Sequence, residues 1–304
     1  MQRPPILGTR GSPLALAQAR MVAAALEQAH GWEPGFVQLR TVRTSGDRIQ
    51  DRPLAEVGGK YLWTKELDQH LIAGETDFSV HSMKDVESVR PAELHLAAML
   101  PRADVRDRVV GASSINDLSQ GALVGTSSPR RAAQLLRRRP DLQTVSIRGN
   151  VATRLGKVGT EVDATLLAAA GLDRLGISEG CAIETDFMLP APAQAAVGAE
   201  CRSEDEGMRA LLAAINHLPT CAAVHAERAF AREVGGSCHS PVAALAIAGP
   251  DGRLWLRAEL LSTDGSEQVA GEVRYDPDNA PETPRQLARD LLDRAPPSVR
   301  ALFA

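Results

Sequence analysis

Residues 6–13, Ile-Leu-Gly-Thr-Arg-Gly-Ser-Pro, and residues 122–129, Ala-Leu-Val-Gly-Thr-Ser-Ser-Pro, follow the same order. In each stretch a short apolar run leads through a Gly-Thr pair into Ser-Pro. Serine is favoured as the residue that caps a helix, and proline as the first residue inside it. Both stretches therefore predict a strand that turns directly into a helix. Gly31 is expected to end the first helix, and Pro140 the second.

Strands and helices alternate along both halves of the chain around these two stretches. Further strands are predicted at residues 36–42, 77–80, 145–147 and 163–168, and helices at 13–30, 62–73, 130–139, 150–157, 204–217 and 220–234. Such alternation is typical of parallel sheets flanked by helices. The sequence therefore predicts an α/β fold with two lobes, each built on a sheet rich in parallel strands.

The pattern changes after residue 241. Two apolar stretches, residues 242–248 and 254–261, lie on either side of Gly249-Pro250-Asp251-Gly252, a cluster typical of a hairpin turn. A third strand near residues 268–274 and a last helix at 282–294 follow. This end of the chain is predicted to form a small α+β domain.

Composition and missing motifs exclude several classes of function. The 304 residues carry 34 Lys and Arg against 38 Asp and Glu, a net charge of −4, which disfavours a nucleic-acid partner. No apolar run approaches the roughly 18–20 residues of a membrane-spanning helix, and the first residues lack an apolar signal core. We therefore expect a cytoplasmic protein. Phosphate-loop, dinucleotide, nucleophile-elbow and zinc-protease motifs are absent, and no metal site is predicted.

Arginines gather at the predicted strand ends and helix starts. Only four of the 34 basic residues are lysines. The base composition of the genome is one explanation. The other is anion recognition, because arginine binds carboxylates and phosphates through a planar fork. The arginines at such positions are Arg10, Arg130, Arg131, Arg148 and Arg154. The helix starts at Ser12 and Ser128 would add free N–H groups, which suit an anion. The triplet at 137–139 shows that arginines also cover solvent faces, so these residues alone leave both interpretations open.

Two further segments contain candidate chemical groups. Lys84 and Asp85 follow a predicted strand end, where open α/β sheets place their sites, although a surface ion pair would look the same. Cys238 lies in the glycine-flanked loop Val-Gly-Gly-Ser-Cys-His-Ser-Pro at 234–241, so it is a candidate nucleophile or attachment point. A buried, inert thiol is the alternative.

These motifs together resemble those of the porphobilinogen deaminases. The resemblance spans nearly the whole chain and rests on residues 8–16, 57–60, 80–86, 125–131, 148–151, 170–176 and the loop with Cys238. It implies two lobes like those of periplasmic binding proteins, the second inserted into the first, and a small third domain. The implied boundaries are residues 1–100 with 194–217 for lobe 1, 101–193 for lobe 2, and 218–304 for the C-terminal α+β domain.

The resemblance also implies the chemistry. In the family, four porphobilinogen molecules join head to tail, each losing ammonia, and give linear hydroxymethylbilane. A dipyrromethane cofactor, built from substrate and held by a thioether to a cysteine, primes the chain, and Cys238 matches that cysteine. Asp85 matches the catalytic carboxylate, which protonates the leaving amine or pairs with pyrrole N–H groups and the cationic azafulvene.

The other implied site residues would mostly neutralise the acetates and propionates that every pyrrole carries. For the cofactor they are Lys84, Arg130, Arg131, Ser128, Thr126 and Asp47, and for the substrate Arg10, Ser12, Arg148, Asn150, Arg154, Arg174, Gln194 and Trp63. The sequence departs from the family pattern at Tyr61 and Trp63, usually Gly and Phe, and at Glu87, where proline is frequent. It also has Ala-Gln194-Ala where Gly-Gln-Gly is usual, which costs backbone freedom.

Two other functions would use part of this pattern. A non-catalytic, two-lobed solute sensor that binds anions would explain the lobes and arginines, but not Asp85 and Cys238 together. A hydrolase with a cysteine nucleophile would use Cys238 alone. The family suggests a monomer with the small molecule porphobilinogen as its substrate and no membrane partner.

Overall fold

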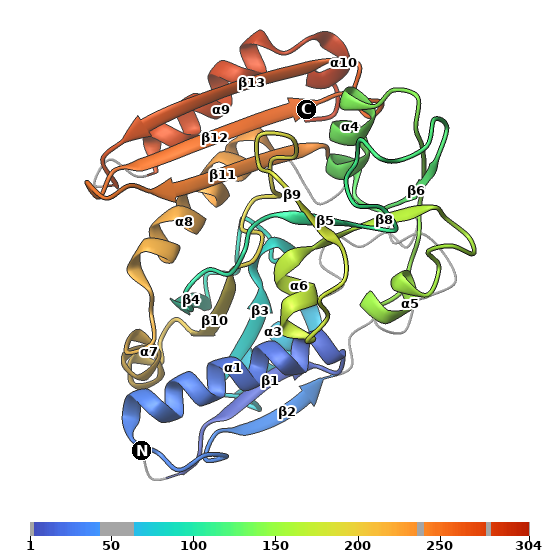
Figure 1. Ribbon diagram of the computed structural model, residues 1–304. Helices are drawn as coiled ribbons and strands as arrows, with labels where there is room; N and C mark the ends of the chain where they lie inside the picture. The colour runs from blue at the N-terminus through green and yellow to red at the C-terminus, as the bar shows by residue number, and fades with distance from the viewer. Residues whose placement is uncertain (1–2, 43–63, 236–239, 278–280, 304) are drawn as a thin grey trace. The chain divides into compact units, whose positions relative to one another are not determined.

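The computed structural model describes residues 3–42, 64–235, 240–277 and 281–303 (Figure 1). Two compact units are formed, one by Met1–Ala103 with Ala196–Cys221, the other by Asp104–Ala195 with Ala222–Ala304. Both units are discontinuous in sequence. The finer division into three domains stays a prediction. Among the described residues, no helix has both the length and the apolar character needed to cross a bilayer.

The first unit is built on a five-stranded sheet in the order β2-β1-β3-β10-β4. Strands β1, β2 and β3 are parallel, whereas β10 runs antiparallel to both of its neighbours. The strands are β1 (Ile6–Arg10), β2 (Gln38–Val42), β3 (Phe78–Ser82), β4 (Leu94–Met99) and β10 (Val197–Arg202). The helices wholly within it are α1 (Pro13–His30), α3 (Lys65–Ile72) and α7 (Glu206–Ala213).

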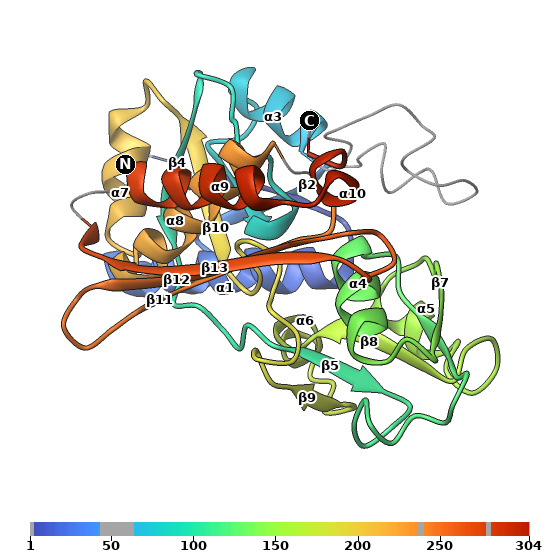
Figure 2. The same cartoon turned by 90° about the horizontal axis from the view of Figure 1, so that it is seen from above.

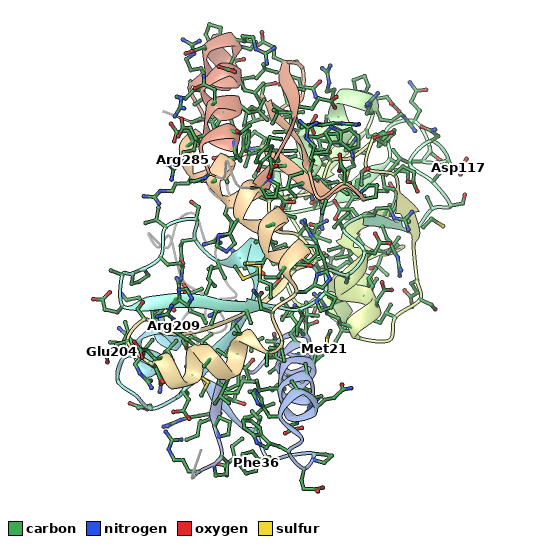
Figure 3. The ribbon with its side chains drawn as sticks, turned by 90° about the vertical axis from the view of Figure 1, so that its left-hand side faces the viewer. Met21, Phe36, Asp117, Glu204, Arg209 and Arg285 are labelled. Carbon is green, nitrogen blue, oxygen red and sulfur yellow. The ribbon has the colours of Figure 1, made fainter. Side chains whose placement is uncertain are left out.

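Helix α1 forms where its sequence signals predict. Ser12 caps it by accepting the Ala15 amide at 3.3 Å, and Gly31 ends it with a left-handed φ of +64°. Its apolar stripe packs on the sheet around Leu7, so α1 lies across one face of β1 and β3 (Figure 1). Beyond the helix the chain turns through Phe36, which is labelled in Figure 3.

The second unit contains a similar sheet and an antiparallel one. The five-stranded sheet has the order β7-β6-β8-β5-β9, with β6 parallel to β7 and β8, and β5 antiparallel to β8 and β9. Its strands are β5 (Asp107–Val110), β6 (Leu123–Gly125), β7 (Gln143–Val145), β8 (Ala164–Ala168) and β9 (Cys181–Ile183). Its helices are α4 (Pro129–Arg138), α5 (Val151–Leu155) and α6 (Ala169–Arg174).

The antiparallel sheet has the order β11-β12-β13. Its strands are β11 (Val242–Ala248), β12 (Leu254–Leu261) and β13 (Gln268–Tyr275), and the remaining helices are α8 (Leu218–Val234), α9 (Glu282–Arg294) and α10 (Pro297–Arg300). Phe230 of α8 and Leu291 of α9 belong to one core with the sheet, and Figure 2 shows α9 running along it. Arg285, near the start of α9, is labelled in Figure 3.

These sheets confirm the predicted fold class: two α/β sheets rich in parallel strands and a small C-terminal α+β part. The observed bounds differ from the predicted ones by a few residues at element ends, for example 38–42 rather than 36–42 for β2. Strands β4, β5, β9 and β10 were not predicted.

Candidate active site

Asp85 lies at the end of a tight turn that Met83 anchors. Strand β3 continues into one 3-10 turn, η1 (Met83–Asp85). The Met83 side chain is buried, and a Cβ at Gly198 of β10 would lie only 2.3 Å from its sulfur. The Met83 amide also donates to the Ala196 carbonyl at 3.0 Å. Because glycine at 198 leaves room for Met83, the turn is fixed from beneath while Asp85 stays exposed.

Asp85 borders a hollow of about 60 Å³ in the first unit. Arg10 and Ser12, from the junction of β1 and α1, line the same hollow, as does Thr64 before α3. The start of α1 brings the positive end of the helix dipole to this place, and the Arg10 guanidinium adds charge and donors. Three predicted site residues, one carboxylate and two anion-binding groups, therefore surround one hollow. Lys84 is half-buried on the same turn.

In the second unit, Arg130 and Arg131 are buried together with Asp107 of β5. Their Nη2 atoms each donate to one carboxylate oxygen of Asp107 at 2.7 Å. Burial, the largest effect, would raise the pKa of Asp107, but the two guanidinium charges outweigh it and hold that pKa well below its usual range. Burial also lowers the pKa of Arg130.

This cluster of Asp107, Arg130 and Arg131 carries two positive charges against one negative charge. The Nε atoms of both arginines are buried and have no hydrogen-bond partner among the described residues. Buried donors are normally satisfied, and a buried excess charge is normally compensated. The cluster is therefore suited to accept one further anionic group.

The start of helix α4 is built by two hydroxyl groups. Thr126 accepts the Ser128 amide at 3.2 Å, and the Ser128 hydroxyl accepts the Arg131 amide at 3.4 Å, so Ser128 caps the helix as predicted. Asn150 likewise caps α5, accepting the Thr153 amide at 2.9 Å.

Arg148 and Arg154 flank the Asn150 cap, and both are half-buried. The Arg154 Nε donates to the Gly149 carbonyl at 2.9 Å. The predicted arginines of the second unit thus lie next to two capped helix starts, those of α4 and α5.

Gln194 lies between two alanines whose backbone is in the left-handed region. Ala193 has φ +61° and Ala195 has φ +70°. The side-chain Nε2 of Gln194 donates to Asp107 at 2.9 Å, and Arg174 donates to the Ala195 carbonyl at 2.6 Å. This backbone conformation is energetically unfavourable for residues with a Cβ, which explains why glycines are usual at these two positions in the family pattern. Gln194 therefore extends the cluster around Asp107, and Arg174 fixes the backbone beside it.

Three predicted site residues, Asp47, Trp63 and Cys238, lie outside the described residues. Among the described cysteines, burial raises the pKa of the Cys201 thiol to about 11 and also raises that of Cys221. Neither thiol is activated for attack at neutral pH.

Sequence reasoning missed Asp107, which pairs with Arg130 and Arg131, and the buried ion pair of Arg90 with Glu200 in the first unit. Their partners are distant in the chain, so no local motif marks them. A larger hollow of about 400 Å³ in the second unit, next to Arg137 and Arg138, contains none of the predicted site residues.

Comparison with known proteins places the chain in a family. The family model "Porphobilinogen deaminase, dipyromethane cofactor binding domain" matches residues 6–210, and the model of the C-terminal domain of porphobilinogen deaminase matches residues 221–293. Among solved structures, the second substrate-binding domain of GlnP from Lactococcus lactis has a TM-score of 0.42 and 8% identity, over 70% of this chain and 87% of that one.

Relatives named porphobilinogen deaminase match almost end to end. The protein of Sphingopyxis alaskensis is 55% identical over 98% of this chain and 96% of its own length, and that of Paracoccus denitrificans is 48% identical over 97% and 96%. The chloroplastic protein of Oryza sativa is 44% identical over 96% of this chain and 84% of its own. The chain is therefore a member of the porphobilinogen deaminase family.

Proposed function

We propose that this chain joins four porphobilinogen molecules head to tail, with loss of one ammonia for each. Water then cleaves the tetrapyrrole from the cofactor and releases it as linear hydroxymethylbilane. The observation that carries the proposal is the exposed Asp85 carboxylate on an anchored turn, beside the Arg10 guanidinium and the start of α1. The family named in the comparisons supports it. A solute sensor or a cysteine hydrolase would not require this carboxylate.

The residues also fit the dipyrromethane group that the family implies. That group carries acetate and propionate carboxylates. The cluster of Asp107, Arg130 and Arg131 has two positive charges against one negative charge, and Nε donors without a partner among the described residues. When bound through Cys238, the group would supply the pyrrole carbon at which chain growth begins. Ser128 and Thr126 would present the start of α4 to a carboxylate, and Lys84 would add a further positive charge.

Asp85 would act on the aminomethyl group of the substrate. As an acid it gives a proton to the leaving nitrogen, so that ammonia departs, and as a carboxylate it stabilises the positive charge left on the pyrrole. Arg10, Ser12, Arg148, Asn150, Arg154, Arg174 and Gln194 would bind and orient substrate carboxylates. Asp47 would contact the cofactor, and Trp63 the substrate. We further propose that the protein works as a monomer in the cytoplasm.

The test is Asp85→Asn in purified protein incubated with porphobilinogen. We expect ammonia release and porphobilinogen consumption to fall at least about 100-fold, in the range that general acid catalysis contributes. The melting temperature should change little, because Asp85 is exposed. Unchanged turnover in this variant would remove Asp85 from the mechanism. A wild-type protein that never consumes porphobilinogen would overturn the proposed function.

A further inference from the structure

Glu87 and Arg90 follow the turn that carries Asp85 and connect it to the rest of the first unit. The Arg90 guanidinium binds Glu200 of β10 through both oxygens, from Nε at 2.9 Å and from Nη2 at 2.6 Å. Its Nη2 also donates to Asp68 of α3 at 2.6 Å, and its Nη1 donates to Glu87. The Arg90 side chain is only 9% exposed.

Glu87 continues this network to Thr64, which lines the hollow. Its Oε1 accepts the hydroxyl of Thr64 at 2.7 Å. Thr64 precedes α3. It lines the hollow together with Asp85 and Val86. The Thr64 hydroxyl does not cap α3, so its hydrogen bond to Glu87 has no role in starting that helix. One carboxylate, Glu87, therefore links the wall formed by Thr64 to the turn that carries Asp85.

The network of Arg90 with Glu87, Asp68 and Glu200 consists of largely buried ion pairs. Burial, the largest effect, would raise the pKa of Glu200, but His81 and Arg90 outweigh it and lower that pKa to about 2. Asp68, Glu200 and His81 would also make a plausible set of metal ligands, with ligand atoms within 4.8 Å of one another. The Arg90 guanidinium already supplies a cation to both carboxylates, so we read the set as an ion-pair network. Charge-assisted, bidentate hydrogen bonds of this kind fix geometry.

We propose that Glu87 and Arg90 are positioning residues for Asp85, and that they set the reach of its carboxylate into the hollow. The inference rests on the proposed function of Asp85. Met83 anchors the turn before Asp85, and the Glu87–Arg90 pair anchors it after Asp85. With only the first anchor, the carboxylate could move relative to Arg10 and Ser12, and misplacement of a catalytic group by about 1 Å can cost about 100-fold in rate.

A purely structural role for the network is the alternative. It would lower stability when the network is cut, but the folded enzyme would keep its turnover. A positioning role predicts that kcat falls while KM for porphobilinogen stays within about twofold, because Arg10 and Ser12 remain in place. It also predicts that geometry matters more than charge at residue 87.

The experiment compares Glu87→Ala, Glu87→Gln, Thr64→Val and the double variant Glu87→Ala/Thr64→Val in the full-length enzyme. Glu75→Ala is the matched control, since Glu75 is an exposed, paired carboxylate of the same unit. We expect Glu87→Ala to lower kcat about tenfold or more. Glu87→Gln, which can still accept the Thr64 hydroxyl and contact Arg90, should recover kcat to within about threefold of wild type.

The double variant should be no slower than Glu87→Ala alone, because both changes cut the same link. Hydrogen exchange of the Val86 amide, which donates to the Met83 carbonyl at 3.3 Å, gives a readout independent of turnover. It should accelerate in Glu87→Ala and stay unchanged in Glu75→Ala.

Wild-type kcat in Glu87→Ala, with a lower melting temperature, would overturn the positioning role and leave the proposed function intact. Equal losses in Glu87→Ala and Glu87→Gln would also overturn it, because they would assign the effect to charge. An inactive wild type would instead refute the proposed function itself, and the exchange rate of Val86 would still test the anchoring.

Discussion

Asp107→Asn tests the structural account of the arginine cluster at the start of α4. The Asp107 carboxylate is fully buried, and the Arg130 and Arg131 side chains are only 4% and 7% exposed. Neutralising Asp107 leaves two almost fully buried guanidinium groups without the carboxylate that pairs with both of them. Breaking a buried ion pair in this way costs about 3–5 kcal/mol. With a urea dependence of about 2–3 kcal/mol per molar, the unfolding midpoint should fall by about 1–2.5 M.

Asp104→Asn is the matched control for this measurement. Asp104 also pairs with an arginine, Arg106 at 2.9 Å, but both side chains are about a third exposed. An exposed pair contributes at most about 1 kcal/mol, so this variant should unfold near the wild-type midpoint. Urea titrations followed by circular dichroism compare the three proteins. Equal midpoints for Asp107→Asn and Asp104→Asn would refute the assignment of Asp107 as the buried counter-ion.

Two further predictions follow from backbone strain and from charge. Ala195→Gly should raise the unfolding free energy by up to about 1 kcal/mol in the same titration. A φ of +70° costs a residue with a Cβ about 1–2 kcal/mol, and the greater entropy of glycine in the unfolded chain offsets part of that gain. A lower midpoint would contradict this. Acid should destabilise the first unit as pH falls from about 4.5 towards 2. The pKa of Glu200 is lowered to about 2 in the fold, so its contribution to stability is complete above its unfolded pKa and is lost as pH falls towards 2. The raised pKa of Asp68 acts in the opposite direction. Stability that rises on acidification through this range, measured by thermal melts, would show that Asp68 dominates.

The sequence predicted those parts of the fold that short-range chemistry determines. Ser12, Ser128 and Asn150 are caps whose partners lie three residues away, so the starts of α1, α4 and α5 could be recognised directly. The hairpin of β11 and β12 follows from its turn residues. Strands β5 and β9 were missed because they have only four and three residues and pair with strands that are remote in sequence.

The candidate site was predictable by residue type but not by partner. Arg130 and Arg131 were expected to bind carboxylates, and the structure shows that a carboxylate of the chain itself, Asp107, lies between them. Glu87 looked only like a departure from a family pattern, because its link to Thr64 spans 23 residues and the bond from Arg90 to Glu200 spans 110. Such contacts depend on the assembled sheet, which no local pattern encodes.

The intact mass of the protein tests the central claim most directly. Wild-type protein and a Cys238→Ala variant are produced in a host that makes heme, and their masses are compared. The account predicts an added mass equal to a dipyrromethane on the wild type and none on the variant. An unmodified wild type that stays unmodified after incubation with porphobilinogen would contradict the account.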